Sequence, residues 1–391
     1  MNKIKLLVAL PNHELPPRAG TPGIGTLIHR QLQAMDYDQF EITAVCNATN
    51  AGNLIDTAKY KSIVLPFHKA LSGLIKVLPE RMRQFLFGIG TAIKLYRCLR
   101  IFLWILVRCN KFDVIILHNY PAPAEWLIKG KNLLHFKSKI IYYYHSSGTD
   151  GFLNTHKRLL KADGIVTISG ESSNNLSNIK HINIINNYSS LPGLDIKEKE
   201  YNPVIQGPLR LISTNTIEPN KGIEILVSAI LILNSNKINV KLDIYGHSRN
   251  KQYFENVMSL INGLSNISYF GFLNNNELLL KMHDYDLAVV LSQQREGNSM
   301  SAIEALVEAQ IPVIASNLGG SPLVLNYGKF GFIIDDFKNP QALANLLSEL
   351  AQQRYLLTEK KQAIKSEAAS YFSPYKSAKS LSSFIVEVLN A

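Results

Sequence analysis

Two glutamates in the second half of the chain stand where an α/β protein binds its ligands. The apolar run from Asp286 to Ser292 predicts a buried parallel strand, and helical periodicity resumes at Met300. Glu296 therefore follows the carboxyl end of this strand, and Glu304, after seven intervening residues, lies early in the helix. Ligands of open α/β sheets bind at the carboxyl ends of the strands. Both carboxylates are therefore candidates for contact with a ligand.

Each glutamate also has an interpretation that requires no ligand. Ser301-x-x-Glu304 before an apolar run matches a capping box, and Glu296 could be a solvated loop acid. Their joint position in a strand-turn-helix unit favours the functional interpretation. A second apolar strand at 312–316 and a Gly319-Gly320 turn follow this unit and support it.

Lys221 is a candidate phosphate ligand on electrostatic grounds. The strand-helix pattern restarts with an apolar run at 209–215, and a helix with one apolar face begins near Ile223. A lysine in the first turn of a helix adds positive charge to the positive end of the helix dipole, which is unfavourable unless an anion is bound. The sequence therefore predicts that Lys221 meets an anion at this helix end.

The segment around the two glutamates resembles the retaining glycosyltransferases of family 4. These enzymes carry two glutamates separated by seven residues, and Gly297 and Met300 fall where the family pattern expects them. The resemblance implies that Glu296 sits against the donor sugar, that Glu304 holds the nucleotide ribose, and that Lys221 binds phosphate. It extends over nearly the whole chain, but its specific motifs lie in the second half.

The same resemblance implies roles for further residues. Amides of the turn before the helix are expected to face sugar and phosphate, and His145 is expected to face the donor sugar. The expected donor contacts are Glu304, Gly297, Asn298, Ser299, Met300, Asn215, Thr216 and Gly246. The expected catalytic residues are Glu296, Lys221 and His145. No metal and no cofactor are expected beside the nucleotide sugar.

The chain departs from the family pattern at two places. The family has Gly-Arg five residues before the lysine, whereas this chain has Asn215-Thr216. The guanidinium that would share the charge of the leaving diphosphate is therefore missing, and Arg295 and Arg249 are candidates to replace it. Leu323 stands where the family often has a glutamate.

The loop Gly23-Ile24-Gly25 is a candidate phosphate or acceptor site. It follows a predicted strand at 3–10 and opens a helix, where glycine lets the backbone approach an anion. The glycines lack the G-x-G-x-x-G spacing of a dinucleotide site, which argues against a dehydrogenase. The loop resembles the amino-terminal loop of the same glycosyltransferases. A flexible surface loop is the alternative interpretation.

Two further strands of the first half each end in a histidine. The apolar runs at 114–118 and 139–144 place His118 and His145 at the carboxyl edge of the predicted sheet. Family members often carry a histidine after the second of these strands, so His145 is preferred over His118. A structural histidine is the alternative for each of them.

The segment from 76 to 111 is both basic and apolar. Between its terminal lysines, six arginines and lysines stand against a single acid, with large aromatic side chains interleaved. Such a segment can rest on an anionic membrane surface. A helix that covers the sheet and has a solvated basic side explains the pattern equally well.

Asp284-Tyr285-Asp286 matches the metal-binding D-x-D of other glycosyltransferases only superficially. It lies at the amino end of its predicted strand, away from the edge where ligands bind. We therefore interpret it as the end of a helix and the start of a strand.

Length and composition limit the remaining choices. A chain of 391 residues exceeds one ordinary core and predicts two domains. The net charge of +11 favours an anionic partner, and three cysteines are too few for a disulfide framework, which favours a reducing compartment. The longest apolar run, at 101–107, is too short to cross a bilayer. We expect a cytoplasmic protein, with membrane contact through 76–111 as one of the two interpretations above.

The sequence predicts an α/β protein of the GT-B class, with two Rossmann-like domains whose parallel sheets face a central cleft. The expected parts are an acceptor-binding domain at 1–190, a linker at 191–207, a nucleotide-sugar-binding domain at 208–370 and a tail helix at 371–391 that returns to the first domain.

The expected activity is retaining, metal-independent transfer of a hexosyl or N-acetylhexosaminyl unit from a nucleotide sugar to a glycan or lipid-linked acceptor. A sugar-nucleotide epimerase and a non-catalytic nucleotide-sugar-binding partner are the alternatives. Nucleic acid would also explain the positive charge, but the sequence contains no nucleic-acid-binding motif.

Overall fold

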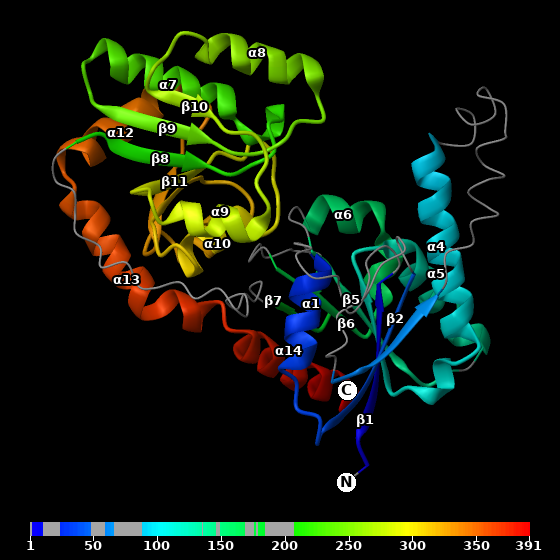
Figure 1. Ribbon diagram of the computed structural model, residues 1–391. Helices are drawn as coiled ribbons and strands as arrows, with labels where there is room; N and C mark the ends of the chain where they lie inside the picture. Colours follow the sequence, from blue (N-terminus) through cyan, green and yellow to red (C-terminus); the bar gives the residue numbers. More distant parts are fainter. Residues whose placement is uncertain are drawn as a thin grey trace. The chain divides into compact units, whose positions relative to one another are not determined.

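The computed structural model describes residues 2–10, 24–47, 59–65, 88–134, 136–145, 149–168, 176, 179–183 and 207–391 (Figure 1). The chain divides into two compact units. The first contains the described residues up to 183 together with 374–391, and the second contains 207–373. Gly23 and nearly all of the predicted linker at 191–207 lie outside the described residues.

A seven-stranded parallel sheet forms the centre of the first unit. Its strand order is β3-β2-β1-β4-β5-β6-β7, so the direction in which strands are added reverses between β1 and β4. The central strands are apolar runs buried on both faces, as is typical of a parallel sheet covered by helices. The strands are Ile4–Leu10 (β1), Phe40–Asn47 (β2), Lys61–Leu65 (β3), Val114–His118 (β4), Lys139–Tyr143 (β5), Gly164–Thr167 (β6) and His181–Asn183 (β7).

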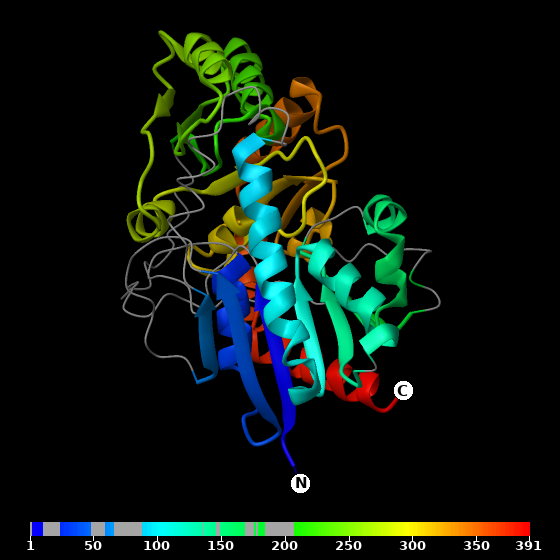
Figure 2. The same ribbon diagram turned by 90° about the vertical axis from the view of Figure 1, so that its right-hand side faces the viewer.

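Helices cover both faces of this sheet (Figures 1 and 2). One hydrophobic cluster packs α1 and α14 against one face, and another packs α4 and α5 against the other. The helices are Ile24–Gln33 (α1), Gly88–Leu106 (α4), Pro121–Leu134 (α5), Thr149–Thr155 (α6) and Pro374–Leu389 (α14), with 3-10 helices at Cys109–Lys111 and Lys157–Lys161.

The last helix of the chain, α14, is part of the core of the first unit. The side-chain amide of Gln31 in α1 donates a hydrogen bond to Ser377 Oγ at 2.6 Å. A Cβ on Gly164 of β6 would lie 2.9 Å from the ring of Phe384 and 3.0 Å from the side chain of Val388. The helix therefore packs directly on the strands.

The second unit has a six-stranded parallel sheet with the order β10-β9-β8-β11-β12-β13. Its order reverses between β8 and β11, as the order of the first sheet does between β1 and β4. The strands are Leu209–Ser213 (β8), Val240–Ile244 (β9), Ile267–Tyr269 (β10), Leu287–Val290 (β11), Val313–Ser316 (β12) and Gly331–Ile334 (β13).

Helices also cover both faces of the second sheet. One cluster packs α7, α8 and α12 on one face, and another packs α9, α10 and α13 on the other. The helices are Ile223–Ser235 (α7), Lys251–Ile261 (α8), Asn275–Met282 (α9), Met300–Val307 (α10), Ser321–Val324 (α11), Pro340–Gln352 (α12) and Tyr355–Tyr371 (α13), with a 3-10 helix at Pro219–Lys221.

The prediction of an α/β protein with two parallel, helix-covered sheets is confirmed. Strand β10 ends at Tyr269, and Gly271, two residues later, has a φ of 75°, which extended backbone does not adopt. No helix in the described part of the chain has the length and apolar character needed to span a bilayer.

Candidate functional site

Lys221 and Glu296 follow adjacent strands of the second sheet. β8 leads into the 3-10 helix that ends at Lys221, and β11 leads into the loop that carries Glu296. The two strands are neighbours at the point where the strand order reverses. In open α/β sheets, ligands bind at the carboxyl ends of the strands at this point. The topology therefore brings both side chains to the expected ligand edge.

The two side chains form an ion pair. Lys221 Nζ lies 2.8 Å from each of the carboxylate oxygens of Glu296. The hydroxyl of Ser292 donates a further hydrogen bond to Oε1 of the same carboxylate. The lysine side chain is 17% exposed and that of the glutamate 30%, so the pair remains within reach of a ligand. A phosphate could compete with the carboxylate for the ammonium, because both are strong acceptors of charge-assisted hydrogen bonds.

The position of Lys221 differs from the predicted one. The lysine ends a 3-10 helix, and Gly222 separates it from Ile223, the first residue of α7. Gly222 has a φ of 60°, and this left-handed backbone ends one helix and allows the next to begin. The lysine is therefore outside the first turn of α7. Its counter-charge in this structure is Glu296, so the helix dipole alone gives no reason to require a bound anion.

Gly222 also fixes the loop after β8 against the loop after β11. A Cβ at this position would lie 2.7 Å from the carbonyl oxygen of Leu291 and 2.6 Å from Nε2 of Gln293. The backbone N–H of Gln293 donates to the carbonyl oxygen of Asn220 at 2.9 Å. Only glycine allows this approach without displacing the backbone that carries Lys221.

The Gly319-Gly320 turn supports Glu296 from the neighbouring strand β12. The N–H of Gly320 donates to the carbonyl oxygen of Glu296 at 3.0 Å. Gly319 has a φ of 59°, and a Cβ there would overlap that carbonyl oxygen. A Cβ on Gly320 would lie 2.6 Å from the carbonyl oxygen of Gly297. The turn thus holds the main chain of the Glu296 loop by contacts that a larger residue would block.

Helix α10 begins at Met300, immediately after the buried residues Asn298 and Ser299. The amide group of Asn298 has no hydrogen-bond partner among the described residues. Glu304 lies one turn into the helix and is buried. Ser301 is inside the helix, and its hydroxyl donates to the carbonyl oxygen of Thr214 at 3.3 Å. The capping-box interpretation is therefore wrong, because Ser301 does not occupy the position before the helix.

Asn215 and Gly246 lie against each other at the ends of β8 and β9. Gly246 has a φ of 149°, and a Cβ there would overlap the carbonyl oxygen of Asn215. Asn215 is buried, and its Nδ2 has no hydrogen-bond partner among the described residues. Thr216 follows and is half-buried. Buried amides normally find partners, so Asn215 and Asn298 are groups that a polar ligand could satisfy.

His118 and His145 of the first unit form a buried pair. His118 ends β4 and His145 follows β5, and these strands are neighbours. His118 Nδ1 and His145 Nε2 are 2.8 Å apart, so one ring donates a hydrogen bond to the other. Both rings stack on Tyr143. The neighbouring strands with histidine ends were the sequence signal for this contact, although His145 alone is expected to act.

The remaining predicted loop is only partly described. Ile24 begins α1, and Gly25 is buried in its first turn. Gly23 lies outside the described residues. The role of this loop at phosphate or acceptor stays a prediction.

Residues 195–370 match the family described as glycosyl transferases group 1. These residues form a glycosyl transferases group 1 domain, which contains Lys221, Glu296 and Glu304. The chain also has the GT-B fold, with its two Rossmann-like parallel-sheet domains. The crystal structure of Anabaena Alr3699/HepE in complex with UDP and glucose aligns with a TM-score of 0.66 and 15% identity, over 98% of this chain and 100% of that one. At this identity the likeness establishes the fold alone.

Two curated relatives are similar to this chain over different lengths. An uncharacterized 41.2 kDa protein in the cps region of Klebsiella pneumoniae is 25% identical over 294 residues, which cover 68% of this chain and 76% of the relative. Spore coat protein SA of Bacillus subtilis is 42% identical over 65 residues. The matched segment is 17% of the length of either chain in that pair.

The structure shows where the residues that depart from the family pattern lie. Thr216 stands where the family carries arginine, and the two candidates to replace that guanidinium, Arg249 and Arg295, are both exposed. Leu323 lies in the short helix α11, and its carbonyl oxygen accepts a hydrogen bond from the hydroxyl of Tyr371 at 2.8 Å. This contact uses the main chain and does not depend on the side chain at position 323.

Asp286 of the D-x-D sequence is a structural carboxylate. It is buried just before β11, and accepts hydrogen bonds from Arg210 at 2.9 Å and from Arg354 at 3.3 Å. Burial alone would raise the pKa of this carboxyl, but its bonds to Arg210 and the nearby charges of Arg210 and Lys361 hold the pKa below its usual value. Asp284 pairs with Lys281 on the surface. Among the described residues no group of three or more histidines, cysteines or acids could hold a metal ion.

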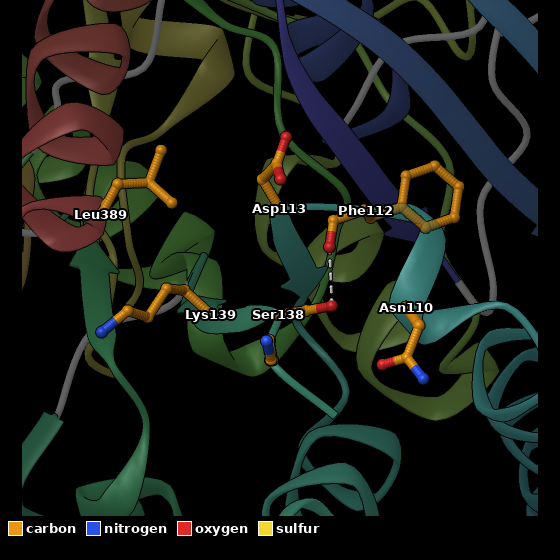
Figure 3. A pocket seen from close by; sticks show the side chains of 7 residues that line it. Asn110, Phe112, Asp113, Ser138, Lys139 and Leu389 are labelled. Carbon is orange, nitrogen blue, oxygen red and sulfur yellow. Dashed lines mark hydrogen bonds between the residues drawn. The ribbon is translucent and has the colours of Figure 1, made fainter. Parts of the chain in front are cut away.

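A surface pocket of the first unit lies at the opposite sheet edge from the histidines. Figure 3 shows it next to the residues that precede β4 and begin β5, with the hydroxyl of Ser138 bonded to the carbonyl oxygen of Phe112 at 2.7 Å. Asp113 and Lys139 line it at the amino ends of these strands. Open α/β sheets bind ligands at the other edge, so this pocket is not the candidate site.

Proposed function

We propose that the protein is a retaining glycosyltransferase that moves a hexosyl or N-acetylhexosaminyl unit from a nucleotide sugar to a hydroxyl of a growing surface glycan. The observation that carries the proposal is the ion pair of Lys221 and Glu296 at the strand reversal of a group 1 domain. A surface glycan as the acceptor is supported by the relatives, which are a spore coat protein and a protein of a cps region.

The transfer breaks the bond between the anomeric carbon and the diphosphate, and the bonding electrons leave with the β-phosphate. The acceptor oxygen bonds to the anomeric carbon on the same face and passes its proton to an oxygen of the departing β-phosphate. Lys221 is placed to meet the charge that develops on the leaving phosphate, which is where preorganised donors stabilise a transition state most. The N-terminal amides of α10, next to Asn298 and Ser299, add positive potential for the same charge.

Glu296 and Glu304 have different proposed tasks. Glu296 orients the donor sugar and favours positive charge at the anomeric carbon. Its carboxylate holds the ammonium of Lys221, so the donor phosphate must draw the lysine toward itself. Glu304, buried in α10, accepts hydrogen bonds from the ribose hydroxyls. Asn215, Thr216 and Gly246 line the donor site from the ends of β8 and β9.

His145 is proposed as a contact of the donor sugar. It lies at the carboxyl edge of the first sheet, where ligands of such sheets bind, and is fixed by its hydrogen bond to His118. His118 then acts as a positioning residue, because it holds one ring nitrogen of His145 and so selects which nitrogen carries the proton. No metal is part of this proposal.

A second candidate is a non-catalytic protein that binds a nucleotide sugar. The observation that favours it is Asn215-Thr216, which replaces the Gly-Arg of the family and removes a guanidinium from the leaving diphosphate. Such a protein would bind the nucleotide but would not turn over the donor with any acceptor.

The proposal is tested first by nucleotide binding to the full chain. UDP and UDP-glucose are the first probes, because a structure of this fold holds UDP and glucose, and other nucleoside diphosphates follow. A ligand at one hundred times its dissociation constant stabilises by about 2.7 kcal/mol, which thermal unfolding detects. Lys221→Ala should raise the dissociation constant for the nucleoside diphosphate about tenfold or more, because a charge-assisted bond to phosphate is lost.

Lys251→Ala is the matched control, since this lysine of the same unit has a 90% exposed side chain paired with Glu255. If no nucleotide stabilises the chain, or if the two lysine variants bind alike, the donor site is wrongly placed. Incubation of the donor with lipid and glycan extracts then separates the candidates. Transfer needs an acceptor, an epimerase converts the donor without one, and a non-catalytic protein leaves the donor unchanged.

A further inference from the structure

The outward face of α4 carries a row of exposed aliphatic side chains. Leu99, Leu103 and Val107 follow one another at intervals of four residues, and their exposed fractions are 43%, 50% and 77%. Residues four apart lie on one face of a helix, and Val107 continues the last turn by donating its N–H to Leu103. On the opposite face Ile101 and Ile105 are fully buried in the core of the first unit.

The exposed large hydrophobic side chains of the first unit are concentrated in this row. Four large hydrophobic side chains of that unit are exposed among its described residues, and three of them are Leu99, Leu103 and Val107. The fourth, Tyr375, lies on α14. Large hydrophobic side chains gathered in one exposed patch mark an interaction surface, whereas scattered ones do not.

The same segment is strongly basic. Residues 88–112 contain five lysines and arginines and no acid. The guanidinium of Arg108 lies 4.8 Å from the ring centre of Trp104, and that of Arg100 lies 5.6 Å from the ring centre of Tyr96. These contacts hold the cationic groups along the helix beside the aliphatic row. The segment therefore combines apolar and cationic residues and contains no acidic one.

We propose that this face of α4 docks on the surface of an anionic phospholipid bilayer. Leu99, Leu103 and Val107 enter the headgroup region, and the neighbouring arginines contact lipid phosphates. The helix lies on the bilayer and does not cross it, in keeping with its buried opposite face. The charge of the segment selects the occupant, because an anionic lipid surface satisfies both the cations and the aliphatic row, whereas nucleic acid satisfies only the cations.

The structure also separates this proposal from the second interpretation of the basic segment. A helix that only covers the sheet would turn its charged side chains directly outward. In α4 the residues opposite the buried Ile101 and Ile105 are the aliphatic Leu99 and Leu103, and Arg100 follows Leu99. An aliphatic outermost row is typical of a helix at a membrane interface.

The test is flotation of the full chain with phosphatidylcholine vesicles that contain or lack phosphatidylglycerol. The wild-type chain should float with the anionic vesicles and stay in solution with the neutral ones, and salt should release it. The double variant Leu103→Glu, Val107→Glu should lower the partition coefficient about tenfold or more, because it replaces apolar contacts by charges that the lipid repels. Arg108→Gln should give a smaller loss, of about fivefold.

Leu280→Glu is the matched control, because Leu280 is also 50% exposed but lies on α9 of the second unit. It should bind vesicles as the wild type does. Thermal unfolding and nucleotide binding of every variant show whether the fold is intact. Failure of nucleotide binding with intact flotation would remove only the proposed transferase function, since the docking surface does not depend on it.

Several results would overturn the docking surface. The wild type could fail to float with anionic vesicles, or could bind neutral vesicles equally well. The double variant could bind as the wild type does. A wild-type dimer in gel filtration that the double variant dissociates would make the face a contact between copies of the chain. Retention on DNA that disappears in the same variant would make it a nucleic-acid surface.

Discussion

The two units share their strand order but differ in chemistry at the edge where that order reverses. The second unit places a cation and an anion there, and Lys221 and Glu296 meet at 2.8 Å. The first unit places two histidines at the corresponding edge, bonded to each other and stacked on Tyr143. A hydrogen bond between two imidazole rings requires at least one of them to be neutral. The same type of sheet thus carries an ion pair in the second unit and a hydrogen-bonded pair of imidazole rings in the first.

Glycines with close contacts in the two units also meet different kinds of neighbour. In the second unit Gly222, Gly246 and Gly319 have positive φ values, and a Cβ on any of them would collide with main-chain atoms. In the first unit the close contact of Gly164 is with the side chains of Phe384 and Val388. Side chains can shift, whereas a main chain held by a sheet cannot. The loops at the strand reversal of the second sheet therefore require glycine, whereas the position of Gly164, at the amino end of β6, depends on side-chain packing.

Substitution of the two glutamates gives the largest expected effects. Glu296→Ala should lower the transfer rate about a thousandfold, while UDP binding stays equal or strengthens, because the variant releases Lys221 for the phosphate. Glu304→Ala should instead weaken nucleotide binding about tenfold through the lost ribose contact. Initial rates and calorimetric titrations measure the two quantities separately.

Glu255→Ala serves as the control, because its side chain is 54% exposed on α8. Its rate and affinity should equal those of the wild type. Wild-type transfer in both site variants would remove the assignment, and a loss of UDP affinity in Glu296→Ala alone would exchange the roles of the two glutamates.

The glycine contrast predicts a graded effect on stability. Gly319→Ala should destabilise the chain by about 3 kcal/mol, from left-handed strain and from overlap with the carbonyl oxygen of Glu296. Gly263→Ala has the same kind of strain, with a φ of 79°, but no atom within 4 Å, and should cost only about 1 kcal/mol. Gly164→Ala should destabilise the chain less than Gly319→Ala does, because the neighbours of Gly164 are side chains.

Urea unfolding of the three variants measures these differences. Equal losses for Gly319→Ala and Gly263→Ala would mean that the contact with Glu296 contributes nothing. A larger loss for Gly164→Ala than for Gly319→Ala would reverse the contrast between the two units.

The same contrast explains how far the sequence alone could lead. Local patterns predicted the strand, turn and helix that carry Glu296 and Glu304. They also predicted the Gly319-Gly320 turn, because main-chain contacts there require glycine. The histidine ends of β4 and β5 were also visible in the sequence. Their mutual hydrogen bond was not, since the pattern does not fix the rotation of a side chain at the end of a strand.

Other features were beyond local patterns for stated reasons. The ion pair of Lys221 joins residues 75 positions apart, so only the strand order reveals it. The αL backbone of Gly222, which moves Lys221 out of α7, does not show in a helical periodicity. Helix α5 opens with Pro121 and Pro123, which suggest a loop but are tolerated where the first N–H groups lack helical partners. Helix α8, in contrast, has apolar residues at helical spacing from Tyr253 to Ile261, so its sequence did contain a signal for a helix.

The two units should also differ in how their stability depends on pH. Burial, and then the charge of Arg30, lower the pKa of His29, whose Nδ1 lies 2.7 Å from the hydroxyl of Tyr60. Between that lowered pKa and 6.5 the unfolded chain binds more protons, so the stability of the first unit falls as the pH drops through this window. Burial, partly opposed by Asp286, lowers the pKa of Lys361 to about 8 from 10.5. The stability of the second unit should therefore rise between pH 8 and 10.5.

Tryptophan fluorescence can follow the first unit by itself, because the only two tryptophans of the chain, Trp104 and Trp126, lie on α4 and α5. His29→Gln should reduce the loss of stability of the first unit at acid pH, by at most about 1 kcal/mol. Lys361→Met keeps the apolar stem and should stabilise the second unit at pH 7 by about 2 kcal/mol, with the gain disappearing toward pH 10.5. Circular dichroism, which reports both units, measures that gain. A gain for Lys361→Met that persists unchanged at pH 10.5 would show that packing, and not the buried charge, is responsible.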